Sequence, residues 1–146
     1  MNIERLEIMA TILDEVEANT WQRTVPYPEA LEKTVVPTDA PVRFNMDCWG
    51  FPSVASNDTP CGYSACAIGH AILDERLPEL VTAGHTPALM PQYGNIRCWD
   101  AVEAYFDLTE DQADRIFNQD SYINPDGVRA IQVATRIRAL TGGYWS

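Results

Sequence analysis

The sequence is poor in positive charge, and this restricts what the protein can bind. Lysine occurs once, at Lys33, and 10 basic side chains stand against 21 acidic ones, so the formal net charge is −11. A nucleic-acid-binding surface needs a stripe of cations that displaces counterions from phosphates. The composition therefore argues against direct binding of nucleic acid.

Long apolar runs are also missing. No stretch approaches the roughly 20 consecutive apolar residues that span a membrane. The start of the chain, from Met1 to Arg5, is not a basic segment leading into an apolar run. We therefore expect no membrane span, no signal peptide and a cytoplasmic location. In that compartment the four cysteines are expected to be free thiols: Cys48, Cys61, Cys66 and Cys98.

The rest of the composition is typical of one folded domain. With 146 residues, of which 46% are hydrophobic and 21% charged, we expect a single globular domain over residues 1–146. Apolar residues recur at helical spacing in four segments, which are residues 3–18, 96–106, 109–117 and 124–140. The third begins with a capping box, Thr109 to Gln112.

A fifth segment, residues 64–75, is nearly all apolar and predicts a buried central helix, with Ile68 and Ile72 inside the core. Residues 20–62 are instead broken by six prolines. They predict an irregular Pro-rich flap, with room for a small β-hairpin, in which residues 45–63 are the irregular segment of most functional interest. The predicted fold class is mainly α, with about five helices around the central one.

The densest chemistry lies at Cys61, Cys66 and His70. On a helix, Cys66 and His70 share one face and have the spacing to bind a metal or to act as thiol and base. Cys61 is expected just before the helix, where amide dipoles favour a thiolate. The simpler interpretation, which we prefer, is a buried cysteine beside a hydrogen-bonded histidine.

Two features argue against a metal or catalytic site at these three residues. The spacing C-x4-C-x3-H is not that of a familiar zinc finger or ribbon, which leaves zinc as a minority alternative and no cofactor as the main expectation. Nor does the sequence show a third group to orient a catalytic cysteine and histidine. The residues therefore favour a protein that is not an enzyme.

Aromatic residues cluster around the same segment. They either line a pocket for a small molecule or nucleotide, or form the wall of the core, and core packing is the favoured interpretation. The set is Phe44, Trp49, Phe51, Tyr63, Tyr93 and Trp99.

The uneven distribution of charge has the most functional content. Residues 100–126 hold eight acidic side chains and only Arg115 as a cation, a net charge of −7. The surface is either an ordinary solvated helix face or a docking face for a basic protein. The residues we expect to bind the partner are Asp100, Glu103, Asp107, Asp111 and Asp114, together with Trp49 and Phe51 in an exposed loop.

Residues 61–140 resemble a group of small uncharacterised bacteriophage and bacterial proteins. Shared features are a Cys-Gly-x-x-x-Cys-x-x-Gly segment, here Cys61 to Gly69, and a helix pair joined through Leu108-Thr109 and Gln112-Ala113. The resemblance implies a phage or prophage setting and no particular reaction. In that group the position of His70 is often tryptophan, so a metal or catalytic role for His70 is not obligatory.

Together these observations predict a non-enzymatic, acidic, phage-type accessory protein that binds a host or phage protein through its acidic face. The partner class that fits is a basic protein, such as one that normally binds nucleic acid. The location is the cytoplasm, which is that of the host cell if the chain is phage-encoded. The alternatives are a thiol- or metal-dependent site at Cys61, Cys66 and His70, and a small-molecule or nucleotide module in the aromatic region.

Overall fold

The computed structural model describes residues 1–21, 42–46, 49–54, 60–82 and 89–143. For residues 42–43, 50–54 and 60–65 it describes the backbone only. Most of the predicted Pro-rich flap, residues 22–41, lies outside the described residues, as do Cys48 and residues 55–59.

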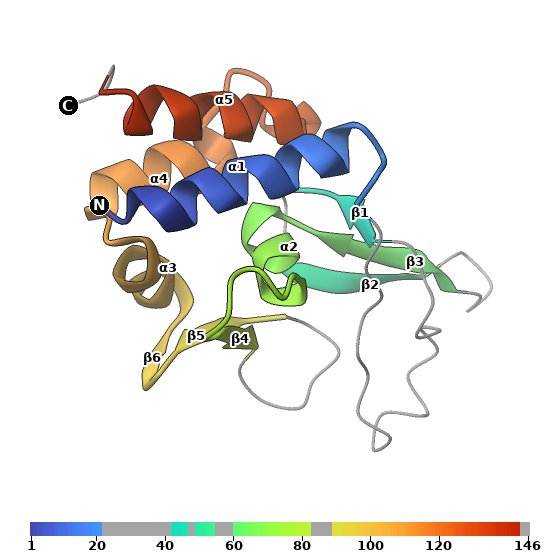
Figure 1. Cartoon of the computed structure of the whole chain (residues 1–146). Helices are drawn as coiled ribbons and strands as arrows, with labels where there is room; N and C mark the ends of the chain where they lie inside the picture. The colour runs from blue at the N-terminus through green and yellow to red at the C-terminus, as the bar shows by residue number, and fades with distance from the viewer. Residues whose placement is uncertain (22–41, 47–48, 55–59, 83–88, 144–146) are drawn as a thin grey trace.

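Two long antiparallel helices form one side of the molecule. α1 (Ile3–Glu17) lies beside α5 (Ala130–Thr141), and the start of α1 and the end of α5 lie at the same end of this pair (Figure 1). Ion pairs tie the helices together, from Arg138 to Asp14 and from Arg129 to Glu17. Between the helices the apolar stripes interlock, and each fully buried Leu or Ile contributes about 1.5 to 3 kcal/mol. Their buried residues include Leu6, Met9, Ile12, Leu13, Val133, Ile137 and Leu140.

The predicted central helix exists but is short. α2 (Ala67–Leu73) lies between α1 and the small sheets (Figure 1), and its residues 67–71 are all buried. Cys66 is its N-cap residue, so Ser64 belongs to the preceding strand and not to the helix. Ile68 is buried as expected, whereas Ile72 is only partly buried because the helix ends one residue later.

The described chain contains two small three-stranded sheets, of which the first lies where the sequence predicted irregular chain with room for a small hairpin and the second follows α2. The first contains β1 (Val42–Phe44), β2 (Gly50–Val54) and β3 (Pro60–Ala65) in the order β1-β3-β2. β1 runs parallel to β3, whereas β2 is antiparallel to it. Because β2 is an edge strand, it accommodates Pro52, which lacks a donor for the ladder. The expectation that residues 45–63 are irregular was therefore wrong for the described residues 50–54 and 60–63.

The second sheet is antiparallel and leads into the remaining helices. It contains β4 (Leu80–Thr82), β5 (Pro91–Tyr93) and β6 (Ile96–Arg97), so the predicted helix over 96–106 begins later than expected. α3 (Cys98–Phe106) and α4 (Glu110–Phe117) follow, with the predicted capping box at the start of α4.

The helix predicted over residues 124–140, with Asn124 as its cap and Pro125 in its first turn, begins later than expected. Pro125–Gly127 forms a separate 3₁₀ turn, as does Gln119–Ser121, and α5 begins only at Ala130. The described chain is mainly α, with five α-helices and two small sheets on one shared core. No helix in these residues is long and apolar enough to cross a membrane.

Candidate functional site

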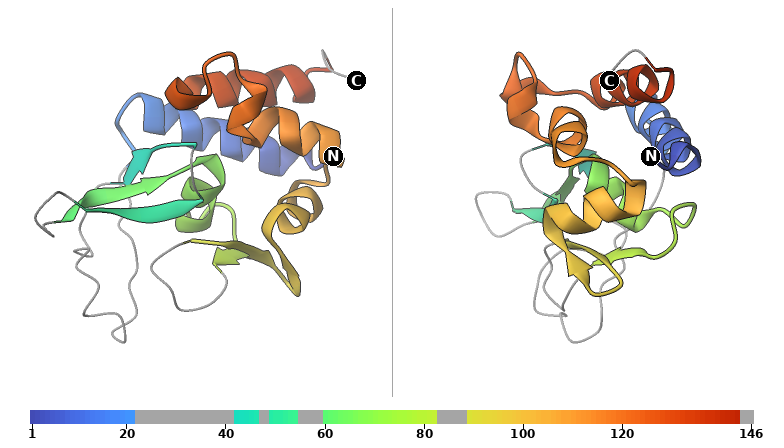
Figure 2. Two further views of the ribbon diagram at one scale, coloured as in Figure 1. Left: turned by 180° about the vertical axis from the view of Figure 1, so that it is seen from behind. Right: turned by 90° about the vertical axis from the view of Figure 1, so that its left-hand side faces the viewer.

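The acidic residues are carried by α3 and α4, which lie next to each other and are seen together in the right-hand view of Figure 2. Asp107 ends α3 in a left-handed conformation, with φ of 53°, which aspartate tolerates better than most residues. Only Leu108 and Thr109 separate it from α4. Phe106 stacks on Phe117, with ring centroids 5.5 Å apart, and this contact holds the two helices together. The tight connection therefore brings acidic side chains of both helices onto one surface.

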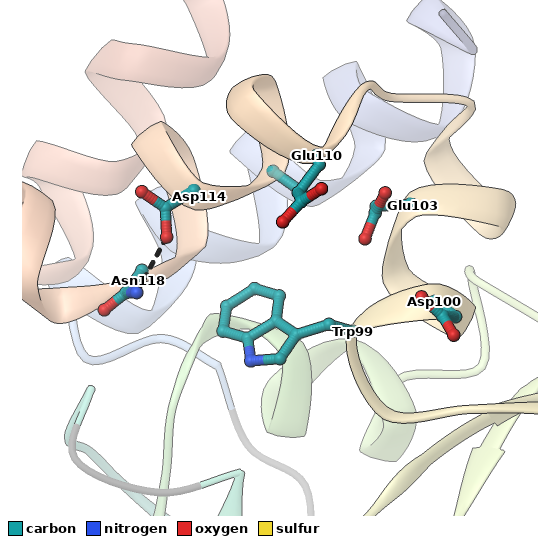
Figure 3. Close-up of a pocket in the computed structure, with 7 residues that line it drawn as sticks. Trp99, Asp100, Glu103, Glu110, Asp114 and Asn118 are labelled. Carbon is teal, nitrogen blue, oxygen red and sulfur yellow. Dashed lines mark hydrogen bonds between the residues drawn. The ribbon is translucent and has the colours of Figure 1, made fainter.

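A pocket of about 280 Å³ lies where the two helices meet. Figure 3 shows the indole of Trp99 at its centre, with the carboxylates of Glu103 and Glu110 facing the space beside the ring and Asp114 on another side. The described residues that line it are Trp99, Asp100, Glu103, Glu110, Ala113, Asp114 and Asn118. We call this the Trp99 pocket. It combines an aromatic surface with four carboxylates.

The position of Trp99 depends on the backbone conformation just before it and on a tertiary ring contact. The preceding residue, Cys98, has φ of 59°, a left-handed conformation that costs a residue with a Cβ about 1 to 2 kcal/mol. The Trp99 ring meets Trp49 edge to face, with centroids 4.9 Å apart. Trp49 is half-buried, so it packs behind Trp99 rather than standing in an exposed loop as the sequence suggested. The side chain of Phe51, in β2, is outside the described side chains.

The charges in and around the pocket are only partly compensated. Asp111 pairs with Arg115 at 3.1 Å, and Asp107 pairs with the ammonium group of Met1 at 2.7 Å. Asp114 accepts hydrogen bonds from Asn118 and Ser121, which orient it without neutralising it. For the other three carboxylates that line the pocket, the described part of the chain supplies no ion pair; they belong to Asp100, Glu103 and Glu110.

A second, shallower hollow continues the negative surface. It has a volume of about 400 Å³ and is lined by Thr109, Glu110, Asp111 and Asp114. Glu110 and Asp114 border both hollows, so the Trp99 pocket opens directly onto the exposed side of α4. We use the name acidic face for the surface formed by Asp100, Glu103, Asp107, Glu110, Asp111 and Asp114.

The structure brings Cys66 and His70 together through a backbone atom. His70 is fully buried, and its Nδ1 donates to the carbonyl oxygen of Cys66 at 2.8 Å. Because its pKa is lowered, the ring is neutral near pH 7 and Nε2 carries no proton. Among the described residues Nε2 has no hydrogen-bond partner. The rings of Trp21 and Phe44 flank it, at 4.7 and 5.7 Å between centroids. Burial lowers the pKa of His70 to about 4.

The thiols of the proposed metal alternative are placed differently from expectation. Cys61 lies in β3 and not next to the start of α2, so helix dipoles do not act on it, and its side chain is not described. The Sγ of Cys66 is 3.7 Å from the carbonyl oxygen of Trp49. Within the described ranges, no three His, Cys, Asp or Glu side chains gather to hold a metal ion.

The aromatic residues that suggested a ligand site are distributed over several places. Phe44 contacts His70, Trp49 contacts Trp99, and Tyr93 contacts Tyr105 at 5.2 Å between centroids. Phe44, Trp49, Tyr93 and Trp99 are partly buried against the core, and the side chains of Phe51 and Tyr63 are outside the described side chains. Of the four described side chains, only Trp99 lines the acidic pocket.

Sequence reasoning missed four residues that line the Trp99 pocket, which are Trp99, Glu110, Ala113 and Asn118. For Trp99 and Glu110, a signal in the sequence exists. Trp99 and Glu103 are four residues apart on α3, as are Glu110 and Asp114 on α4, so each pair shares one helix face. How the two faces meet depends on the angle between the helices, which no local spacing specifies.

Comparisons with known proteins add no family to this description. No protein-family model, no curated protein and no solved structure matches the chain.

Proposed function

We propose that the chain is a non-enzymatic binding protein that docks a basic protein partner on its acidic face. The observation that supports this most is the convergence of carboxylates from α3 and α4 around one concave surface, with Asp100, Glu103 and Glu110 lacking ion pairs within the described residues. A negative concave surface attracts a positive partner, accelerates its diffusional approach and selects against acidic proteins.

The proposed setting is the cytoplasm, and the host-cell cytoplasm if the chain is phage-encoded. The free thiol of Cys98 is compatible with a reducing compartment. The proposed partner is a host or phage protein with a cationic surface, a property that proteins acting on nucleic acid commonly have.

The test compares two variants with equal changes in charge. Asp100→Lys/Glu110→Lys reverses two exposed carboxylates of the acidic face, and Glu4→Lys/Glu7→Lys reverses two exposed carboxylates of α1. Each variant and the parent are used to capture proteins from host lysate at low salt. The association of the purified captured protein is then measured by stopped flow at low and high salt.

The proposal expects a basic protein captured by the parent and by the α1 variant and lost with the acidic-face variant. The association rate with the acidic-face variant should fall about tenfold or more, because exposed charges act mainly on the approach of the partner. Raising the salt concentration should likewise slow the association of the captured protein with the parent. Equal capture by all three proteins, or association that is independent of salt, would contradict docking by this face.

A second candidate, the metal-dependent site at Cys61, Cys66 and His70, has one observation in its favour, the unpaired Nε2 of buried His70. Elemental analysis of protein purified without chelators distinguishes it from the main proposal. We expect well below one zinc per chain. One zinc per chain, lost in His70→Gln, would favour the metal site instead.

A further inference from the structure

The Trp99 pocket has a shape and lining that suit one kind of occupant. Its volume of about 280 Å³ is several times the roughly 30 Å³ that a water molecule occupies in the liquid. The carboxylates of Glu103, Glu110 and Asp114 are spread around the indole rather than gathered at one point (Figure 3). A cation that extends over several atoms fits this arrangement.

Trp99 adds a second, independent attraction for such a cation. The face of an indole carries negative electrostatic potential and is the best natural surface for a cation–π contact. An arginine guanidinium is planar and stacks on an aromatic ring while its N–H groups donate to carboxylates at the ring's edge. An ammonium group is a compact, strongly hydrated charge and gains less from the ring.

The same combination of groups already holds an arginine elsewhere in this molecule. The guanidinium of Arg5 lies over the ring of Tyr105, 4.1 Å from its centroid, and donates to Glu79 at 3.3 Å. Arg136 lies 3.6 Å from the centroid of Tyr122. The Trp99 pocket offers an aromatic ring and carboxylates in the same way, yet in the described part of the chain no arginine lies over Trp99.

We propose that the Trp99 pocket binds an arginine side chain of the docked protein, with the guanidinium stacked on Trp99 between Glu103 and Glu110. This inference rests on the proposed docking function and names the group on the partner that the acidic face recognises. The acidic face attracts any cationic surface, whereas the pocket selects arginine over lysine.

The experiment uses blocked pentapeptides with a single central arginine or lysine, acetyl-Gly-Gly-Arg-Gly-Gly-amide and its lysine counterpart. Both are titrated into the full chain while the indole N–H signals are followed by NMR, with the signal of Trp99 assigned by its loss in Trp99→Phe. Glu103→Gln/Glu110→Gln removes two charges from the pocket at constant shape. Glu4→Gln/Glu7→Gln removes two from α1 as the matched control.

We expect the arginine peptide to shift the Trp99 signal saturably and to bind about fivefold or more tightly than the lysine peptide. Glu103→Gln/Glu110→Gln should weaken arginine binding about tenfold, and the α1 variant less than about twofold. Equal affinity for the two peptides, or an unmoved Trp99 signal, would overturn the inference. The inference would also be overturned if millimolar magnesium, added at constant ionic strength, abolished binding of the arginine peptide.

Failure here is distinguishable from failure of the proposed function. A lysate protein that docks on the acidic face while the arginine peptide leaves Trp99 unmoved would contradict only the arginine pocket. Selective arginine binding without any salt-sensitive lysate partner would contradict only the docking of a basic protein.

Discussion

His70 is a buried histidine whose surroundings favour the neutral ring. It is fully buried, and the aromatic rings of Trp21 and Phe44 flank it. Burial lowers the pKa of His70, whereas the hydrogen bond from Nδ1 to the Cys66 carbonyl and the nearby charge of Asp74 oppose this only in part. A histidine in this state packs the core and makes the fold sensitive to acid.

The sensitivity to acid gives the first prediction. Because the unfolded chain takes up a proton on His70 near pH 6.5 and the folded chain only near pH 4, stability should fall as the pH decreases through this interval. The loss is expected to reach about 3 kcal/mol at most. Urea unfolding at pH 7.5, 5.5 and 4.5 measures it.

The control for this prediction is His70→Gln, which keeps a donor for the Cys66 carbonyl and removes the titrating group. The variant is expected to be less stable than the parent at neutral pH, but to lose less stability between pH 7.5 and 4.5. Parallel pH profiles of the two proteins would show that His70 does not carry the effect.

Asp74 is the second buried ionisable residue, and it differs from His70 because it remains charged. Its carboxylate accepts from Trp21 Nε1 at 2.9 Å and from the backbone and side chain of Arg76, whose guanidinium also reaches both oxygens of Glu15. Burial alone would raise the pKa of Asp74, but the hydrogen bonds from Arg76 and Trp21 outweigh it and lower the pKa to about 2. The network links the end of α2 to α1.

At the level of secondary-structure elements, two arginines form ion pairs with α1, and we expect their removal to cost different amounts of folding stability. Arg76→Ala removes a cation that pairs with the fully buried Asp74 carboxylate at 2.8 Å and should cost about 3 kcal/mol. Arg138→Ala removes an exposed pair with Asp14 on the same helix and should cost less than about 1 kcal/mol. Chemical denaturation at pH 7 compares them, and equal losses would contradict the role assigned to the Asp74 network.

The start of α4 provides another prediction. The hydroxyl of Thr109 accepts a hydrogen bond from the backbone amide of Gln112 at 3.2 Å, and the side-chain Oε1 of Gln112 accepts one from the backbone amide of Thr109 at 3.0 Å. Thr109→Ala should therefore destabilise the protein by about 1 kcal/mol. Thr135→Ala is the control, because the hydroxyl of Thr135 bonds back to Ile131 within α5 and its loss should be nearly neutral. Thermal unfolding of both variants tests the assignment.

The molecule as a whole carries a strong excess of negative charge, and the acidic face concentrates it. Such self-repulsion opposes the compact state and is screened by salt. Raising sodium chloride from low to physiological concentration should increase Tm by about 3 °C. Glu103→Gln/Glu110→Gln should melt at or slightly above the temperature of the parent. A variant that melts much lower would mean that these carboxylates stabilise the fold rather than serve binding.

The helices are largely predictable because each depends on neighbours in the sequence. Apolar residues three and four positions apart identified α1, α3 and α4, and the Thr109 box marked where α4 begins. Errors lay mainly at the boundaries, as with α5 and the shortened α2. There, turn signals such as Asn124-Pro125 are equally compatible with a separate 3₁₀ turn.

Apart from the small hairpin allowed for in residues 20–62, the strands escaped sequence reasoning because their partners are distant. Val42 pairs with Tyr63 in a parallel register, 21 positions further along the chain, and the residues of β2 show no alternation of apolar and polar side chains. Prolines in β2 and β5 pointed to loops. A short strand is stable only when its neighbours supply the hydrogen bonds, so its local pattern is weak.

The sequence by itself determined the mainly α class, the capping of α4 and the excess of acidic residues over residues 100–126. Only the tertiary structure decided that Trp99 and Glu103 of α3 meet Glu110 and Asp114 of α4 around one pocket, and that His70 is enclosed by Trp21 and Phe44. Helical periodicity depends on residues within one or two turns of each other, and the net charge of a segment is counted directly from its residues. A pocket depends on the angle between two helices and on the packing of Phe106 against Phe117, which arise only when the whole core assembles.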